Sequence, residues 1–88
     1  MKSFLVTFSC HQDLDSRVVD QIKTYPFWAR INPKAWIVQS DQNTIEIRNQ
    51  IKQNIPAIDS LLVIGIDGAN WATSSVNKDV TDWMKENI

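Results

Sequence analysis

The residues with the greatest capacity for chemistry lie in one short stretch, Ser9 to Asp15, which reads SCHQDLD. It contains the only cysteine and the only histidine of the chain, Cys10 and His11, followed by the carboxylates of Asp13 and Asp15. Such side chains could form a zinc site, a cysteine nucleophile with a histidine base, or a magnesium site. Their spacing decides between these sites and a purely structural role.

Cys10 and His11 favour the structural role. A structural zinc ion takes about four protein ligands in a recognisable spacing, and the chain offers one cysteine and one histidine. Neighbouring residues in an extended segment also point to opposite sides, which separates the thiol from the imidazole. We therefore interpret Cys10 as a small apolar packing residue and His11 as an exposed loop residue.

The carboxylates allow two interpretations. Asp13 and Asp15 could hold a hard cation such as Mg²⁺, and Asp67 is a further candidate. Two acidic residues at the start of a helix are also what N-capping and the helix dipole favour. We interpret Asp13 as the N-cap of a helix, and Asp67-Gly68 as a turn.

Hydrophobic patterns predict four strands and two helices around this stretch. Runs rich in β-branched and aromatic residues predict the strands, and apolar residues that recur every three or four positions predict the helices. The expected strands cover residues 4–8, 27–31, 35–39 and 61–66, and a turn at 32–34 joins the middle two into a hairpin. The first helix follows Asp13 and stops before Pro26. The second is capped by Ser40 or Asp41 and ends near Ile55.

The order strand, helix, strand, strand, helix, strand predicts an α+β fold of the ferredoxin-like βαββαβ type. This is an antiparallel four-stranded sheet with both helices on one face, in which the last strand lies at an edge beside the first. Residues 70–88 form a tail in which Val76, Val80 and Ile88 indicate a short third helix. Because 88 residues suffice for one domain, we expect residues 1–88 to form a single ferredoxin-like domain with a C-terminal helix.

The last strand suggests self-association. Residues 61–66 contain only apolar side chains and one glycine, whereas natural edge strands are usually blunted by charge or proline. Two helices also cover only one face of the sheet, so either the tail helix or a second subunit must cover the other. We expect a homodimer whose interface includes Leu61, Val63, Ile66, Trp36 and Trp71.

Charge does not point to one class of partner. The formal net charge is −1 and the basic residues are scattered, so there is no general attraction to nucleic acid. A local nucleic-acid-binding surface remains open, and its candidate residues are Arg30, Lys34, Arg48 and Lys52. Trp28 and Trp36, on the two strands of the hairpin, could stack on bases, although cross-strand packing is the simpler role.

The remaining features favour the cytoplasm. One cysteine cannot form an internal disulfide. The apolar run after Lys2 is too short for a signal peptide, and no segment approaches the roughly 18 apolar residues of a membrane span. We therefore expect a cytoplasmic protein that does not enter a membrane.

Four segments together resemble a known family. They are FLVTF at residues 4–8, AWIVQS at 35–40 with TIEIRNQI after it, DSLLVIGIDGANWA at 59–72, and a tail helix with a tryptophan. The chain is similar in these to the SinR-like small proteins of bacteria and phages, which are related to the CRISPR adaptation proteins called Cas-two and to the VapD toxins. The resemblance implies a ferredoxin-like homodimer.

The resemblance also raises the question of nuclease activity. In the nuclease members, an aspartate at the end of the first strand supports metal-dependent cleavage of RNA or DNA. Ser9 stands at the matching position, and a neutral hydroxyl is a poor substitute for a carboxylate ligand of Mg²⁺. Asp13 lies four residues further on and would need a rearranged loop to replace it.

We therefore expect a non-catalytic homodimeric module without a cofactor, which binds a protein or nucleic-acid partner, with a phage or mobile-element setting open. One alternative is a metal-dependent endoribonuclease or endodeoxyribonuclease that uses Mg²⁺ with Asp13 or Asp67. A second alternative is a small-molecule-binding regulatory domain, since such domains share this topology.

Overall fold

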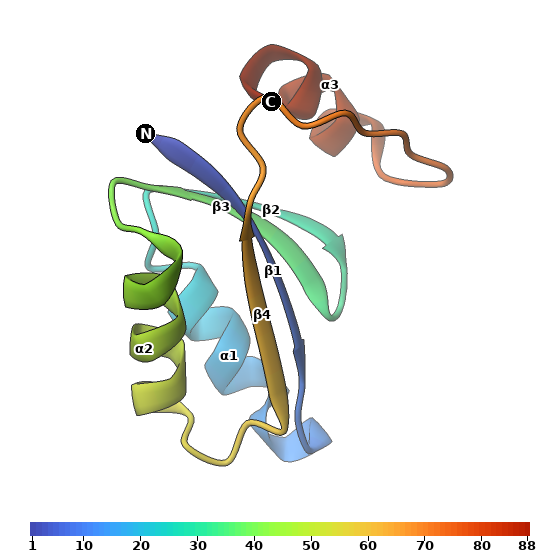
Figure 1. The fold of residues 1–88 in the computed structure, drawn as a ribbon. Helices are drawn as coiled ribbons and strands as arrows, with labels where there is room; N and C mark the ends of the chain where they lie inside the picture. Colours follow the sequence, from blue (N-terminus) through green and yellow to red (C-terminus); the bar gives the residue numbers. More distant parts are fainter.

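The chain folds into a four-stranded antiparallel sheet with two helices against one face and a third helix near one end (Figure 1). The computed structural model describes residues 1–88. The elements are β1 (Lys2–Ser9), the short 3₁₀ helix η1 (Gln12–Leu14), α1 (Asp15–Ile22), β2 (Phe27–Asn32), β3 (Ala35–Ser40), α2 (Thr44–Asn54), β4 (Ser60–Gly65) and α3 (Lys78–Asn87). The predicted α+β class, the βαββαβ order and the C-terminal helix are confirmed.

The sheet has the strand order β2-β3-β1-β4. The same order reads 4-1-3-2 from the other edge. β1 is central and pairs antiparallel with β3 and with β4, so that Phe4 lies opposite Val38 on one side and Gly65 on the other. The prediction that the last strand lies at an edge beside the first is confirmed.

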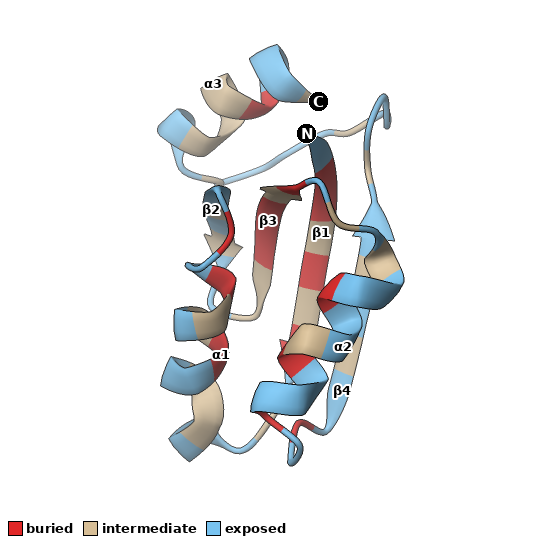
Figure 2. Cartoon of the chain, turned by 90° about the vertical axis from the view of Figure 1, so that its left-hand side faces the viewer, coloured by how far each residue is buried: buried red, intermediate tan, exposed pale blue.

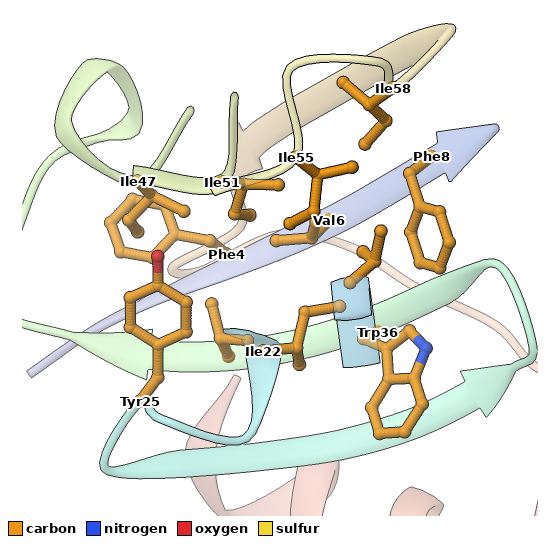
Figure 3. Packing of buried hydrophobic residues seen from close by; sticks show 12 residues of the cluster. Phe4, Val6, Phe8, Ile22, Tyr25, Trp36, Ile47, Ile51, Ile55 and Ile58 are labelled. Carbon is orange, nitrogen blue, oxygen red and sulfur yellow. The ribbon is translucent and has the colours of Figure 1, made fainter. Parts of the chain in front are cut away.

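The core lies between the sheet and the two helices α1 and α2 (Figure 2). Alternate residues of β1, namely Phe4, Val6 and Phe8, point toward the helices and are at most 5% exposed. The helices supply the facing apolar residues, and Tyr25 and Trp36 close the sides of the cluster (Figure 3). The helix residues in this core are Val18 and Ile22 of α1 and Ile47 and Ile51 of α2, with Ile55 and Ile58 just after α2.

The first helix begins differently from the prediction. Asp13 was expected to be its N-cap, but the Asp13 side chain is exposed. The imidazole Nδ1 of His11 instead accepts a hydrogen bond from the backbone N–H of Asp13 at 3.3 Å, at the start of η1. α1 proper begins at Asp15, whose carboxylate lies in the first turn, where the helix dipole favours negative charge.

The N-cap of the second helix is Asn43, not Ser40 or Asp41. The Asn43 side chain accepts the N–H of Glu46 at 2.9 Å, and the Glu46 carboxylate accepts the N–H of Asn43 at 3.1 Å, which makes a capping box. Ser40 cannot take this role because it is still paired with Lys2 in the sheet. Its hydroxyl accepts the N–H of Gln42 within the connecting turn.

The tail covers part of the other face of the sheet. α3 begins at an Asn77 cap, and Met84 is its buried residue. Ile37 points to this face and is 1% exposed, because the tail lies over it. Phe27, Leu62 and Ile64 point to the same face and remain 50%, 53% and 43% exposed. The tail therefore covers one part of this face, and the rest stays open to a partner.

The helices are short. The longest, α2, has 11 residues, and no helix has the length and apolar character needed to cross a membrane.

The capping box of α2 gives a stability prediction. Asn43→Ala removes the acceptor for the Glu46 N–H and should lower the free energy of unfolding by about 1 kcal/mol in a urea titration. Gln53→Ala, on an exposed position of the same helix, is the control and should change it by less than about 0.5 kcal/mol. Equal effects of the two substitutions would contradict the cap assignment.

Candidate functional site

Ser9 is the last residue of β1, in the pairing of this strand with β4. It lies opposite Ser60, and its carbonyl accepts the backbone N–H of Asp59 at 2.9 Å. Its own side chain is exposed. Ser9 is therefore a solvent-facing hydroxyl at the end of a strand.

Three side chains meet near the start of α1, and no pattern in the sequence predicted that they would. The Cys10 thiol donates a hydrogen bond to Oδ1 of Asp15 at 3.2 Å. Lys34, from the β2–β3 hairpin, forms an ion pair with the same carboxylate oxygen. Its ammonium group also lies 5.2 Å from the centroid of the Phe8 ring. We call these three residues, Cys10, Asp15 and Lys34, the thiol cluster.

The surroundings of the thiol cluster disfavour ionisation of the thiol. Partial burial, and then the hydrogen bond to Asp15, raise the pKa of Cys10 above its ordinary value, and the nearby Lys34 ammonium opposes this more weakly. The hydrogen bond from Lys34 holds the pKa of Asp15 below its usual range. The cation thus stabilises the carboxylate, whereas burial and that carboxylate disfavour the thiolate form of Cys10.

Cys10 and His11 bond to different partners. The partner of His11 is Asp13, whose N–H it accepts and whose carboxylate lies 3.3 Å from Nδ1. Cys10 packs against the core as a partly buried residue. The structural interpretation of both residues agrees with these contacts.

The candidate carboxylates lie far apart. Both oxygens of Asp67 accept the backbone N–H of Ser3, at 3.1 and 3.2 Å. Asp13 follows the opposite end of β1, and at about 3.3 Å per residue the two ends of this strand are roughly 20 Å apart. Nowhere do three His, Cys, Asp or Glu side chains gather closely enough to share a metal ion.

The candidate basic residues form two separate pairs. Arg30 and Lys34 belong to the β2–β3 hairpin, whereas Arg48 and Lys52 lie on α2, which packs beside β4 at the other edge of the sheet. Arg30 shares a hollow of about 400 Å³ with Asp15, Asp20 and Lys23, among others. That hollow is therefore of mixed charge.

The two tryptophans of the hairpin pack against each other. Their ring centroids are 6.0 Å apart at an angle of 55°, and the Lys23 ammonium lies 5.0 Å from the Trp28 ring. Trp36 is 4% exposed, and its indole N–H donates to the Pro33 carbonyl at 3.4 Å. Cross-strand packing thus describes the pair, and Trp36 is not on the surface where a second subunit could reach it.

The free edge of β4 is the most distinctive surface feature. The N–H of Ile66 donates to Ser3 across the β1–β4 pair, and bonded and non-bonded pairs alternate in an antiparallel ladder. Ile64, which lies opposite Leu5, and Leu62 therefore bond to β1 in the same way as Ile66. The backbone N–H and C=O groups of the residues between them, Leu61, Val63 and Gly65, point away from β1. These groups are free to pair with another strand.

A groove accompanies this edge. It has a volume of about 280 Å³ and lies between α2 and β4, with Ile45 and Arg48 on the helix side and Leu61, Leu62 and Val63 on the strand side. Of the other predicted interface residues, Ile66 and Trp71 lie further along the chain, next to a second hollow under the tail.

Comparisons of the chain with protein-family models, with curated protein sequences and with solved structures give no match.

The thiol cluster makes a prediction about reactivity. Asp15→Asn removes the negative charge that raises the Cys10 pKa and leaves only a neutral amide oxygen as acceptor, so the midpoint of the pH dependence of alkylation by iodoacetamide should move to lower pH. Lys34→Met should move it the other way. Asp13→Asn is the control and should leave it in place. A midpoint that stays or rises in Asp15→Asn would show that this carboxylate does not govern the thiol.

Proposed function

We propose that this protein is a non-catalytic module that forms a homodimer through β4. The observation that carries the proposal is the free, uncharged edge of that strand. Ser60–Gly65 contains no acidic or basic residue, no proline and no bulge that would block pairing. The dimer is proposed to present a combined surface to a protein partner.

The register of β4 suits pairing with its own copy. In an antiparallel pair about a two-fold axis at Val63, the outward N–H and C=O groups of Leu61 in one copy would face those of Gly65 in the other. Leu62 and Ile64, which are half exposed, would then meet their counterparts on one face of the joined sheet. Because the strand is uncharged, two copies meet without repulsion between like charges.

The strand order supports the ferredoxin-like assignment. Read from β4, the order 4-1-3-2 with two helices on one face is the split βαβ arrangement. The likeness to SinR-like proteins, Cas-two proteins and VapD toxins remains part of this proposal, as do the cytoplasmic location and the phage or mobile-element setting. Ser9 at the end of β1, and Asp67 bound to the Ser3 backbone, support the non-catalytic reading.

The distribution of charge favours a protein over a nucleic acid as the further partner. A nucleic-acid surface needs several cations along one continuous track. Here Arg30 and Lys34 belong to the β2–β3 hairpin, Arg48 and Lys52 lie on α2 beside β4, and Lys34 is paired with Asp15.

The dimer prediction uses two matched substitutions. Leu62→Lys on β4 places an ammonium group at the proposed interface, next to the partner strand, and should convert the dimer to a monomer at micromolar concentration in light scattering. Phe27→Lys on the opposite edge strand changes a residue of similar exposure, 50% against 53%, and should leave the dimer intact.

Two results would contradict the dimer. The first is a monomeric mass for the unmodified chain at micromolar concentration. The second is a dimer that Phe27→Lys dissociates and Leu62→Lys does not, which would move the interface to β2. Circular dichroism of each variant would confirm that the fold is retained.

The non-catalytic part of the proposal has its own test. Labelled single- and double-stranded RNA and DNA should remain intact with the pure protein and Mg²⁺ or Mn²⁺, in amounts equal to samples with EDTA. Cleavage that EDTA abolishes and that Asp13→Asn or Asp67→Asn reduces would establish the nuclease alternative. Gel shifts from the same samples at low salt, where electrostatic binding is strongest, would identify a nucleic-acid partner instead of a protein.

A further inference from the structure

A hollow of about 280 Å³ lies under the tail, on the face of the sheet opposite α1 and α2. Its floor comes from the sheet, with Leu5 of β1, Ile31 of β2 and Ile37 of β3. One wall is the segment that leaves β4 and runs past the N-terminal end of β1 toward β2 before it reaches α3 (Figure 2). The other wall is α3, with Met84 and Ile88.

The lining of this tail cavity is almost entirely apolar. Nine of its 11 lining residues are hydrophobic, and Asn70 and Thr73 are the other two. The 11 residues include no charged side chain. Because burial of an unpaired charge is strongly unfavourable, this lining disfavours a ligand whose charged group would lie against it.

The tail cavity is partly open to solvent. Four residues of its wall, Ala69, Asn70, Ala72 and Thr73, are exposed, whereas Ile37 and Met84 are buried. The main apolar core lies on the other face of this sheet (Figure 3). Met84 is the buried residue of α3, so the tail leaves much of this apolar surface within reach of a ligand.

We propose that the tail cavity binds a neutral bicyclic aromatic compound that carries one hydrogen-bonding group. An apolar cavity of about 150 Å³ accommodates benzene, so about 280 Å³ has room for two fused rings. Met84 and Trp71 on the walls offer a thioether and an indole ring, both of which attract aromatic rings. Asn70 and Thr73 supply the polar group for orientation.

This proposal does not depend on the dimer. The cavity lies between β1, β2, β3 and the tail, and its lining does not include Leu61, Leu62 or Val63 of the proposed dimer edge. Ligand binding is therefore expected to be the same in the unmodified chain and in Leu62→Lys.

The probe for the test is indole. The chain has two methionines, of which Met84 is buried beside the cavity and Met1 is 58% exposed. In a methyl NMR titration, indole should shift the Met84 signal in a saturable manner through its ring current and leave Met1 unchanged. The melting temperature should rise with indole concentration, because the ligand binds the folded state. Indole-3-carboxylate should bind at least tenfold more weakly.

A matched pair of variants locates the site. Ala72→Trp places a large side chain on the cavity wall from an exposed position and should weaken indole binding at least tenfold. Ala57→Trp makes the same change at an exposed position outside the cavity lining and should leave the affinity unchanged. Ala69→Phe, also on the wall, replaces Ala72→Trp if that variant does not fold.

Three results would overturn the proposal. One is a Met84 signal that does not move with millimolar indole. Another is a shift of Met1 and Met84 alike without saturation, which indicates non-specific adsorption. The third is equal affinity of Ala72→Trp and Ala57→Trp.

Discussion

The position of β1 at the centre of the sheet is the constraint on which the rest of the structure depends. Its hydrogen bonds join β3 on one side and β4 on the other. Because side chains alternate between faces, the strand that buries Phe4 and Val6 under the helices also sends Leu5 into the hollow under the tail. With both sides of β1 occupied, β4 becomes an edge with a free row of backbone groups. The core, the cavity and the free edge thus have one origin.

Most of the fold could be predicted because its apolar patterns are strong and local. Val18 and Ile22, and Ile47 and Ile51, mark two helix faces at a spacing of four residues, and the hairpin turn is bounded by Asn32 and Lys34. The helix starts could not be predicted as well. Several residues before α2 have the chemistry of a cap, and the choice of Asn43 depends on how far β3 stays paired with β1. That pairing is a tertiary property.

The candidate site was less accessible to sequence reasoning. The thiol cluster joins a strand end, a helix start and a hairpin turn, and no spacing in the sequence connects Lys34 with Cys10 and Asp15. The separation of Asp13 from Asp67 likewise follows from the direction in which β1 runs. By contrast, the apolar character of β4 was visible in its composition, because an edge without charged residues departs from the usual pattern. Local chemistry can be predicted from composition, but convergence of distant side chains cannot.

The pairing of β1 with β4, in which Phe4 lies opposite Gly65, also has a consequence for biosynthesis. The ribosome makes β1 before the other strands of the sheet, yet β4, the second neighbour of this strand, is the last of them to be made. In the interval, the strand destined for the centre is itself an unprotected edge, and pairings this distant in the chain form slowly and expose nascent chains to aggregation. The yield of folded protein in a cell should therefore respond to the rate of translation and to chaperones that shield exposed strands of a nascent chain.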